Sequence, residues 1–381
     1  MTKRLFGAVA LLIGTIIGAG IFGIPYVISR AGFFPGIIYL ICLGIFALLV
    51  TLSYGEVVLR TKSEHQMTGY AEKYLGKTGK KILTVTLIFS IYGALLAYMI
   101  GVGDFLNTIF SDLIGGAPFL YSIIFFLFGA LAIYAGLKTI ASTERVILIV
   151  VVLVVLAIFA FGVMRIDIGN YLNINPALLF LPYGVILFAF TGATAVVDMR
   201  RYLRGEEKSL KKGIILGHLI PFIIYLIFVV LVVGVSGANT SQEAIRGLGP
   251  FLGSKILILG SILGILAMST SFMNLGLVLR EILQIDYKMT KISAWLTAIS
   301  VPFFIFLLGL TDFIKVIGIA GSVVGGVDGI IILIMNRRAK KMGDRQPEYS
   351  LNIPKTVYYL LFLVFGLGIL YEVYFTIFGK L

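Results

Sequence analysis

Long apolar runs separated by short polar loops recur along the whole chain. Each run is long enough to cross a bilayer as a helix, which takes about 20 apolar residues. The pattern predicts an all-α polytopic membrane protein with 11 spans, near residues 5–29, 33–59, 81–110, 119–137, 145–164, 177–199, 213–236, 254–280, 293–310, 312–336 and 355–378.

Two of these runs carry residues that disfavour a continuous helix. In the first, four glycines precede Pro25: Gly14, Gly18, Gly20 and Gly23. The sixth contains Pro182 in its first part and has a small, polar centre of Thr191, Gly192 and Thr194. Glycine and proline are the poorest helix formers, and unwound backbone at membrane depth is tolerated where it lines a cavity. Both spans are therefore predicted to break and to offer free backbone groups to a ligand. Close helix packing at Gly14 and Gly18 is the alternative.

The broken spans hold the same place in two successive sets of five. This is typical of transporters built from inverted repeats, which bind their substrate at mid-membrane. We expect a first repeat over residues 1–164 and a second over 165–336, followed by a cytoplasmic loop and the eleventh helix over 337–381.

Composition agrees with a membrane protein and excludes a soluble one. Hydrophobic residues make up 59% of the chain, and the mean hydropathy is +1.06. The net charge of +13 does not indicate nucleic acid, because the basic residues gather in alternate loops. With the N-terminus in the cytoplasm and the C-terminus outside, the outward loops hold 6 of the 31 Lys and Arg residues, namely Arg30, Arg165, Arg246, Lys255, Lys315 and Lys380. The chain is thus predicted to be a multi-pass protein of the plasma membrane.

Three other spans carry polar candidates. Tyr92 falls near the middle of the third span, where it can meet a ligand or form a helix-to-helix hydrogen bond. Thr270 and Ser271 in the eighth span can bond to their own backbone or complete an oxygen cage for a cation. Asp328 interrupts the tenth span. An acid inside a membrane is a functional candidate, here a proton site, with a water-accessible vestibule as the alternative.

Several polar residues are assigned to the interfaces. Residues 67–75 have amphipathic spacing and predict a short surface helix. Both histidines are expected to be exposed or interfacial, and two charge pairs to anchor inner helix ends: His65, His218, Glu56 with Arg60, and Asp198 with Arg201.

The first broken span, from Gly14 to Pro25 and then Ala31-Gly32-Phe33, resembles the first-helix motif of the amino acid–polyamine–organocation superfamily. It is most similar to the aromatic and hydroxy amino-acid permease branch. Glu56 and the run Phe188-Ala189-Phe190-Thr191-Gly192 also resemble that superfamily. The resemblance implies a leucine-transporter-like fold of five plus five helices, with helices 1 and 6 broken.

The resemblance also implies roles for individual residues. Amides around the first break would hold the substrate carboxylate, and carbonyls of the second would hold its amino group, with Phe188 as a gating aromatic; the residues are Gly18, Ala19, Gly20, Ile21, Phe188, Ala189 and Thr191. Phe188 and Phe190 would shape the side-chain pocket. A cation site would comprise Gly14, Ile17, Ala267, Thr270 and Ser271. Thr194 stands where many relatives have an acid, which disfavours cationic amino acids.

The predicted function is secondary active transport of neutral or aromatic amino acids by cation-coupled symport, without an enzymatic step. Motifs of intramembrane or serine hydrolases, such as H-E-x-x-H and G-x-S-x-G, are missing from the sequence. An exchanger and a non-transporting amino-acid sensor are the alternatives. No cofactor is expected. Sodium is the first choice of coupling ion, because Val146 to Met164 offers no lysine for the site; protons carried by Asp328 are the second. The expected partners are the amino-acid substrate and the lipid bilayer.

Overall fold

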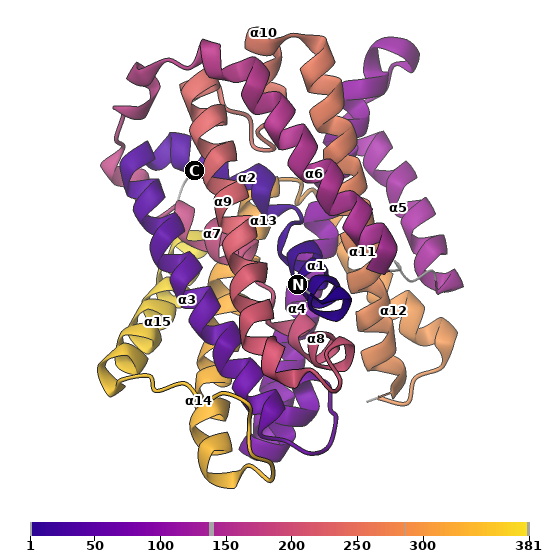
Figure 1. Ribbon diagram of the computed structural model, residues 1–381. Helices are drawn as coiled ribbons and strands as arrows, with labels where there is room; N and C mark the ends of the chain where they lie inside the picture. Colours follow the sequence, from indigo (N-terminus) through magenta and orange to yellow (C-terminus); the bar gives the residue numbers. More distant parts are fainter. Residues whose placement is uncertain (1, 137–140, 286, 379–381) are drawn as a thin grey trace.

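The computed structural model describes residues 2–136, 141–285 and 287–378. Within these residues it consists of helices and loops and has no β-strand (Figure 1). A single isolated bridge joins Gly32 and Ile174. The α-helices are α1 Lys3–Ile16, α2 Gly20–Ala31, α3 Phe33–Leu59, α4 Met67–Ile114, α5 Pro118–Ala135, α6 Ala141–Gly162, α7 Pro182–Ala189, α8 Val196–Tyr202, α9 Leu210–Ser236, α10 Gly249–Leu252, α11 Ser254–Ile285, α12 Lys291–Leu307, α13 Phe313–Ile319, α14 Gly326–Met342 and α15 Lys355–Phe378. Short helical turns are η1 Val163–Arg165, η2 Ile168–Tyr171, η3 Pro176–Leu178, η4 Ala193–Ala195, η5 Glu207–Ser209, η6 Gly237–Asn239, η7 Arg246–Leu248 and the π-helix η8 Ala320–Gly325.

Each predicted span corresponds to a helix or to a set of consecutive helices in the described residues. Eight segments are long and apolar enough to cross a membrane, and the bent pair α1 and α2 adds a ninth. Two shorter apolar helices, Ile149–Arg165 and Lys291–Leu307, match the predicted fifth and ninth spans. The predicted helix over 67–75 is present as the first part of α4, which continues beyond a kink at Gly76, where φ is 75°.

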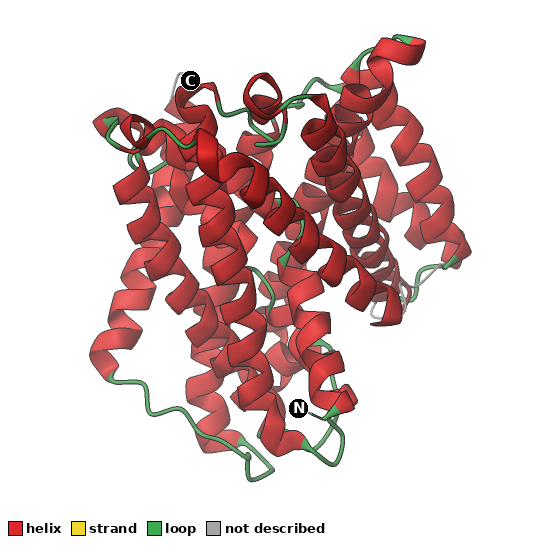
Figure 2. Cartoon of the chain, turned by 45° about the horizontal axis from the view of Figure 1, so that its top comes forward, coloured by secondary structure: helices red, strands yellow, loops and turns green. Residues whose placement is uncertain are grey.

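The helices form one bundle whose members run roughly up and down, so that the start of α1 and the end of α15 lie at opposite ends (Figure 2). α4 packs along α11 and α5, and α9 packs on α1, α2 and α3. Outward faces carry large apolar side chains, such as Phe128 on α5 and Leu367 on α15. Those side chains suit contact with lipid.

The tenth span consists of α13, η8 and α14, because a π-helical turn interrupts it. This turn packs on α7, where a Cβ added at Gly321 would lie 2.7 Å from the amide nitrogen of Phe188. Gly321, Gly325 and Gly329 recur at every fourth position of this span, a spacing that allows close helix contact. Single π-turns of this kind often occur at functional sites.

The expected interfacial exposure of His218 is wrong, whereas both predicted charge pairs form, Glu56 with Arg60 at 2.8 Å and Asp198 with Arg201 at 2.9 Å. His218 is 3% exposed in the packed part of α9, where its Nε2 lies 3.2 Å from the Thr51 hydroxyl and its Nδ1 3.1 Å from the Ile214 carbonyl. Glu56 is nevertheless fully buried, and its carboxylate accepts hydrogen bonds from four groups: Arg60 at 2.8 Å, Ser350 at 2.9 Å, the Leu351 amide at 3.0 Å and Asn336 at 3.1 Å. A charge at a helix end is buried in this way when a distant segment of the chain packs over it. The spacing of apolar residues along the helix does not predict such packing.

Candidate functional site

The first break separates α1 from α2 by three residues, and the two helices meet at 50°. Within the described part of the chain, the amides of Ala19, Gly20 and Ile21 have no hydrogen-bond partner, because helical bonding resumes at Phe22. Unpaired amides at a helix start carry a partial positive charge and attract anions. The predicted carboxylate donors therefore lie together and unpaired.

The second break separates α7 from η4 and α8, over Phe190 to Gly192. Here the carbonyl groups face different partners. The Phe188 carbonyl accepts the Thr191 amide at 3.1 Å, and the Ala189 carbonyl accepts a tyrosine hydroxyl described below. Helix ends of this kind present partial negative charge, which suits an ammonium group.

The two breaks touch each other at backbone level. A Cβ added at Gly20 would lie 2.5 Å from the Cα of Ala189 and would overlap its Cβ. A side chain at position 20 would push the two segments apart. Gly20 therefore permits free amides of one half-helix to lie beside the last turn of another.

Tyr225 of α9 bridges the two broken spans. Its buried hydroxyl lies 2.9 Å from the carbonyl oxygen of Ile16 and 3.0 Å from that of Ala189. These are the last residues of α1 and α7. One hydroxyl proton serves both carbonyls, so the bridge holds two helix C-termini, which would otherwise repel each other, at a fixed separation.

Tyr98 of α4 approaches the first break from the other side. A Cβ added at Gly18 would lie 2.8 Å from the Tyr98 hydroxyl. The same hydroxyl lies close to that of Ser271 on α11, which itself donates to the Ala267 carbonyl. Tyr98 thus connects the unwound backbone to the helix that carries the predicted cation ligands.

The predicted pocket residues divide into three groups. Phe188 is half-buried, whereas Phe190 is 1% exposed and packs on the Tyr225 ring with centroids 5.3 Å apart. Thr191 is exposed and its hydroxyl donates to the Leu187 carbonyl at 3.1 Å. Tyr92 donates to the carbonyl of Thr297 on α12 at 2.9 Å, which is the packing alternative for that residue. Its substrate role stays a prediction.

The predicted cation ligands are partly engaged. Thr270 shares its hydroxyl proton between the Leu266 and Ala267 carbonyls, both at 3.1 Å, and Ser271 donates to the Ala267 carbonyl at 3.0 Å. Hydroxyls that donate in this way keep their lone pairs free for a cation, while the Ala267 carbonyl is already occupied. The carbonyls of Gly14 and Ile17 accept none of the backbone bonds recorded around the first break.

Asp328 lies apart from these ligands, on α14 just after the π-turn. Its carboxylate accepts a hydrogen bond of 2.5 Å from Thr86 on α4, and the side chain is half-buried. This acid therefore has one strong polar partner and no ion pair among the described residues.

With this geometry in place, comparison with known proteins decides the family. The sequence model of the tryptophan/tyrosine permease family matches residues 1–372 of this chain. The chain belongs to this family.

Curated relatives of this permease are amino-acid transporters. Glutamine transporter 2 of Aliivibrio fischeri is 26% identical over 367 residues, covering 93% of this chain and 94% of its own. Tyrosine-specific transport system 1 of Haemophilus influenzae is 26% identical and covers 84% of each chain. The tryptophan-specific transport protein of Shigella flexneri is 23% identical, covering 96% of this permease and 94% of its own length.

Among solved structures, the crystal structure of MhsT in complex with L-phenylalanine matches with a TM-score of 0.69 at 15% identity, over 100% of this permease and 99% of that chain. The predicted leucine-transporter-like fold is confirmed. The permease is a multi-pass amino-acid transporter and not an enzyme. The boundaries drawn between the two repeats stay a prediction.

The sequence patterns of this permease did not predict a role for Tyr225. Its signal is nevertheless present, because a tyrosine in the middle of the apolar seventh span must find a partner for its hydroxyl. What the sequence does not contain is the partner itself, since Ile16 and Ala189 lie 209 and 36 residues away.

Proposed function

We propose that this permease carries neutral or aromatic amino acids by cation-coupled symport, with alternating access to a site at the two breaks. The N-terminus would lie in the cytoplasm and the C-terminus outside, as the distribution of basic residues favours. Plasma membrane is the proposed location.

One observation carries the proposal: the unpaired amides of Ala19, Gly20 and Ile21 lie beside the C-terminal turn of α7. A zwitterionic amino acid needs hydrogen-bond donors for its carboxylate and acceptors for its ammonium group. The donors and acceptors must lie close together, because both groups are attached to the same carbon atom. Two half-helix ends of opposite polarity supply both without a charged side chain.

The surroundings of the breaks favour an uncharged side chain. Phe188 is half-buried next to the second break, and Thr194 stands after it without an acid in the run from Phe188 to Val197. An aromatic wall of this kind suits an apolar or aromatic side chain. The printed names of two relatives, a tyrosine-specific and a tryptophan-specific transporter, support the same class.

Sodium is the proposed coupling ion. The free carbonyls of Gly14 and Ile17 and the hydroxyls of Thr270 and Ser271 are hard oxygen ligands, and none must change protonation to bind a small cation. Because the Ala267 carbonyl already accepts the Ser271 proton and shares that of Thr270 with the Leu266 carbonyl, it is the weakest of the five proposed ligands.

The test is uptake of radiolabelled L-tryptophan into proteoliposomes that contain the full chain, under a sodium gradient at fixed pH or a pH gradient without sodium. We expect the sodium gradient to drive accumulation. Thr270→Ala combined with Ser271→Ala should abolish sodium stimulation, while Ser269→Ala, an adjacent hydroxyl outside the proposed set, should retain it.

Accumulation that follows the pH gradient and is lost in Asp328→Asn would contradict sodium coupling and favour protons. Uptake that requires an amino acid on the opposite side would identify an exchanger. Binding without any uptake would identify a sensor.

A further inference from the structure

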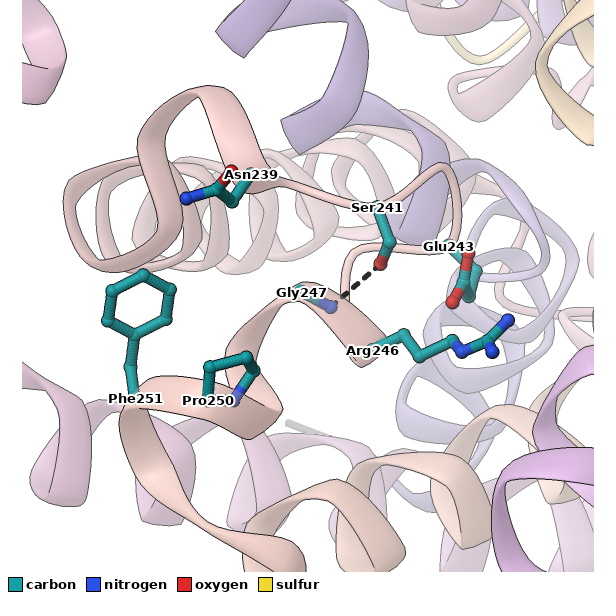
Figure 3. Close-up of a pocket in the computed structure, with 7 residues that line it drawn as sticks. All are labelled: Asn239, Ser241, Glu243, Arg246, Gly247, Pro250 and Phe251. Atoms are coloured by element: carbon teal, nitrogen blue, oxygen red, sulfur yellow. Dashed lines mark hydrogen bonds between the residues drawn. The ribbon is translucent and has the colours of Figure 1, made fainter. Parts of the chain in front are cut away.

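An open, solvent-facing cavity of about 390 Å³ lies in the loop between α9 and α11 and is lined by no residue of either break (Figure 3). Its lining residues come from η6, η7, α10 and the turn between them: Asn239, Ser241, Glu243, Arg246, Gly247 and Phe251, with Pro250 beside the last. The volume falls within the range of about 300–1,000 Å³ that is typical of small-molecule sites.

Glu243 is the unusual group in this cavity. It is 6% exposed, and its Oε1 atom has no hydrogen-bond partner. Ser241 lies close to the carboxylate, and its hydroxyl oxygen accepts the Gly247 amide at 2.9 Å. A buried acceptor without a partner is costly, and the cost is relieved when a ligand supplies the missing donor.

The neighbouring backbone is held in an unfavourable conformation. Ala244 has φ 62°, although it carries a Cβ, and its side chain is fully buried. Such conformations persist where the surrounding structure enforces them, and they cluster at ligand sites. Ala244 directly follows Glu243, so this conformation sets the course of the backbone next to the acid.

Arg246 supplies the opposite charge. Its exposed side chain lines the same cavity, and the described residues form no ion pair between Arg246 and Glu243. In Figure 3 these two side chains lie together at one side, while Phe251 and Pro250 lie at the other. The cavity therefore has a charged end with both signs and an apolar end.

We propose that this cavity is a second binding site for a zwitterionic α-amino acid with an apolar or aromatic side chain. Glu243 would accept the ammonium group, Arg246 would donate to the carboxylate, and Phe251 with Pro250 would contact the side chain. The proposal rests on the geometry of the loop and adds a site to the one at the breaks.

The pH dependence of this site follows from the acid. Burial raises the pKa of Glu243. Hydrogen bonds to the Glu243 carboxylate and the charge of Arg246 lower that pKa and offset part of the effect. Asp104 on α4 is a further acid near this site, since the charge of Glu243 acts on it. A protonated acid cannot hold an ammonium group, so amino-acid binding in the loop should weaken as pH falls, and should do so at a higher pH than for an ordinary glutamate.

The test is the stoichiometry of L-tryptophan binding to the purified full chain at saturation. We expect two equivalents for the parent protein and one for Glu243→Gln, the remaining one being lost when Gly20→Val is added. Arg246→Gln, an exposed position that tolerates change, should also bind one. Asp112→Asn, an exposed acid at the end of α4 that does not line the cavity, should bind two.

Tryptamine, which lacks the carboxylate, and indole-3-propionate, which lacks the ammonium group, should each bind the loop site at least tenfold more weakly than L-tryptophan. One equivalent in the parent, lost in Gly20→Val and unchanged in Glu243→Gln, would overturn the loop site and leave the proposed function intact. Loss in Glu243→Gln together with retention in Gly20→Val would place binding in the loop and contradict the site at the breaks. Equal binding of tryptamine and L-tryptophan in Gly20→Val would identify a plain cation site and also overturn the proposal.

Discussion

The two broken spans reach similar geometry by different means. In the first, glycines leave three amides without partners, and Gly20 admits the neighbouring backbone. In the second, the carbonyls at the end of α7 are taken up by a turn and by the Tyr225 hydroxyl. The first break is therefore open to a ligand because its glycines have no side chains. The second break is held by a side chain from another helix.

This difference predicts where each break is sensitive. The first should fail when a side chain is added, and the second when its support is removed. Substitutions at the two breaks can separate these effects.

The largest effect is expected for Gly20→Val. A Cβ at this position would meet Ala189 at 2.5 Å from its Cα, so the free amides and the α7 terminus must separate. Binding of L-tryptophan at the breaks should be abolished, which equilibrium binding of the purified protein measures. Gly366→Val is the control, since a Cβ at Gly366 meets nothing within 4 Å, and that variant should bind normally.

The next effect separates the two phenylalanines of the second break. Phe190 is buried against Tyr225, so Phe190→Ala should destabilise the protein by about 3–5 kcal/mol, seen in thermal unfolding in detergent. Phe188 is half-buried, so Phe188→Ala should change the order of preference among apolar amino acids with a smaller loss of stability. An unaltered substrate profile in Phe188→Ala would place the side-chain pocket elsewhere.

A smaller effect is expected for Tyr225→Phe. Two buried carbonyls would lose one shared donor, at a cost of about 1–3 kcal/mol. Part of this should appear as weaker substrate binding, up to about tenfold. Tyr183→Phe removes a comparable 3.2 Å hydrogen bond, to Val364 on α15, away from the breaks. If both variants bind alike, Tyr225 has no special role in positioning the breaks.

The sequence predicted the parts of this structure that depend on local composition. Apolar runs identified every span, and glycine and proline identified both breaks, because helix propensity and hydropathy act over a few neighbouring residues. The hydroxyl pair Thr270 and Ser271 was also found, with both of its alternatives open.

What the sequence missed depends on contacts between distant segments. Tyr225 meets Ile16 and Ala189, Glu56 is covered by Ser350 and Leu351, and His218 meets Thr51. A polar residue near a span end can be exposed or covered, and the chain that covers it lies far away in sequence. The π-turn at Ala320 to Gly325 is of the same kind, since an extra residue in a helical turn leaves no change of composition.

The central claim is that unpaired amides at the first break hold the substrate carboxylate. It is tested most directly by comparing L-tryptophan with tryptamine, which lacks that carboxylate, in the Glu243→Gln protein, where the loop site is removed. Each hydrogen bond to a charged group contributes about 1.5–3 kcal/mol, and two or more amides are available. Tryptamine should therefore bind at least about 100-fold more weakly than L-tryptophan. Equal affinity for the two ligands would contradict the account.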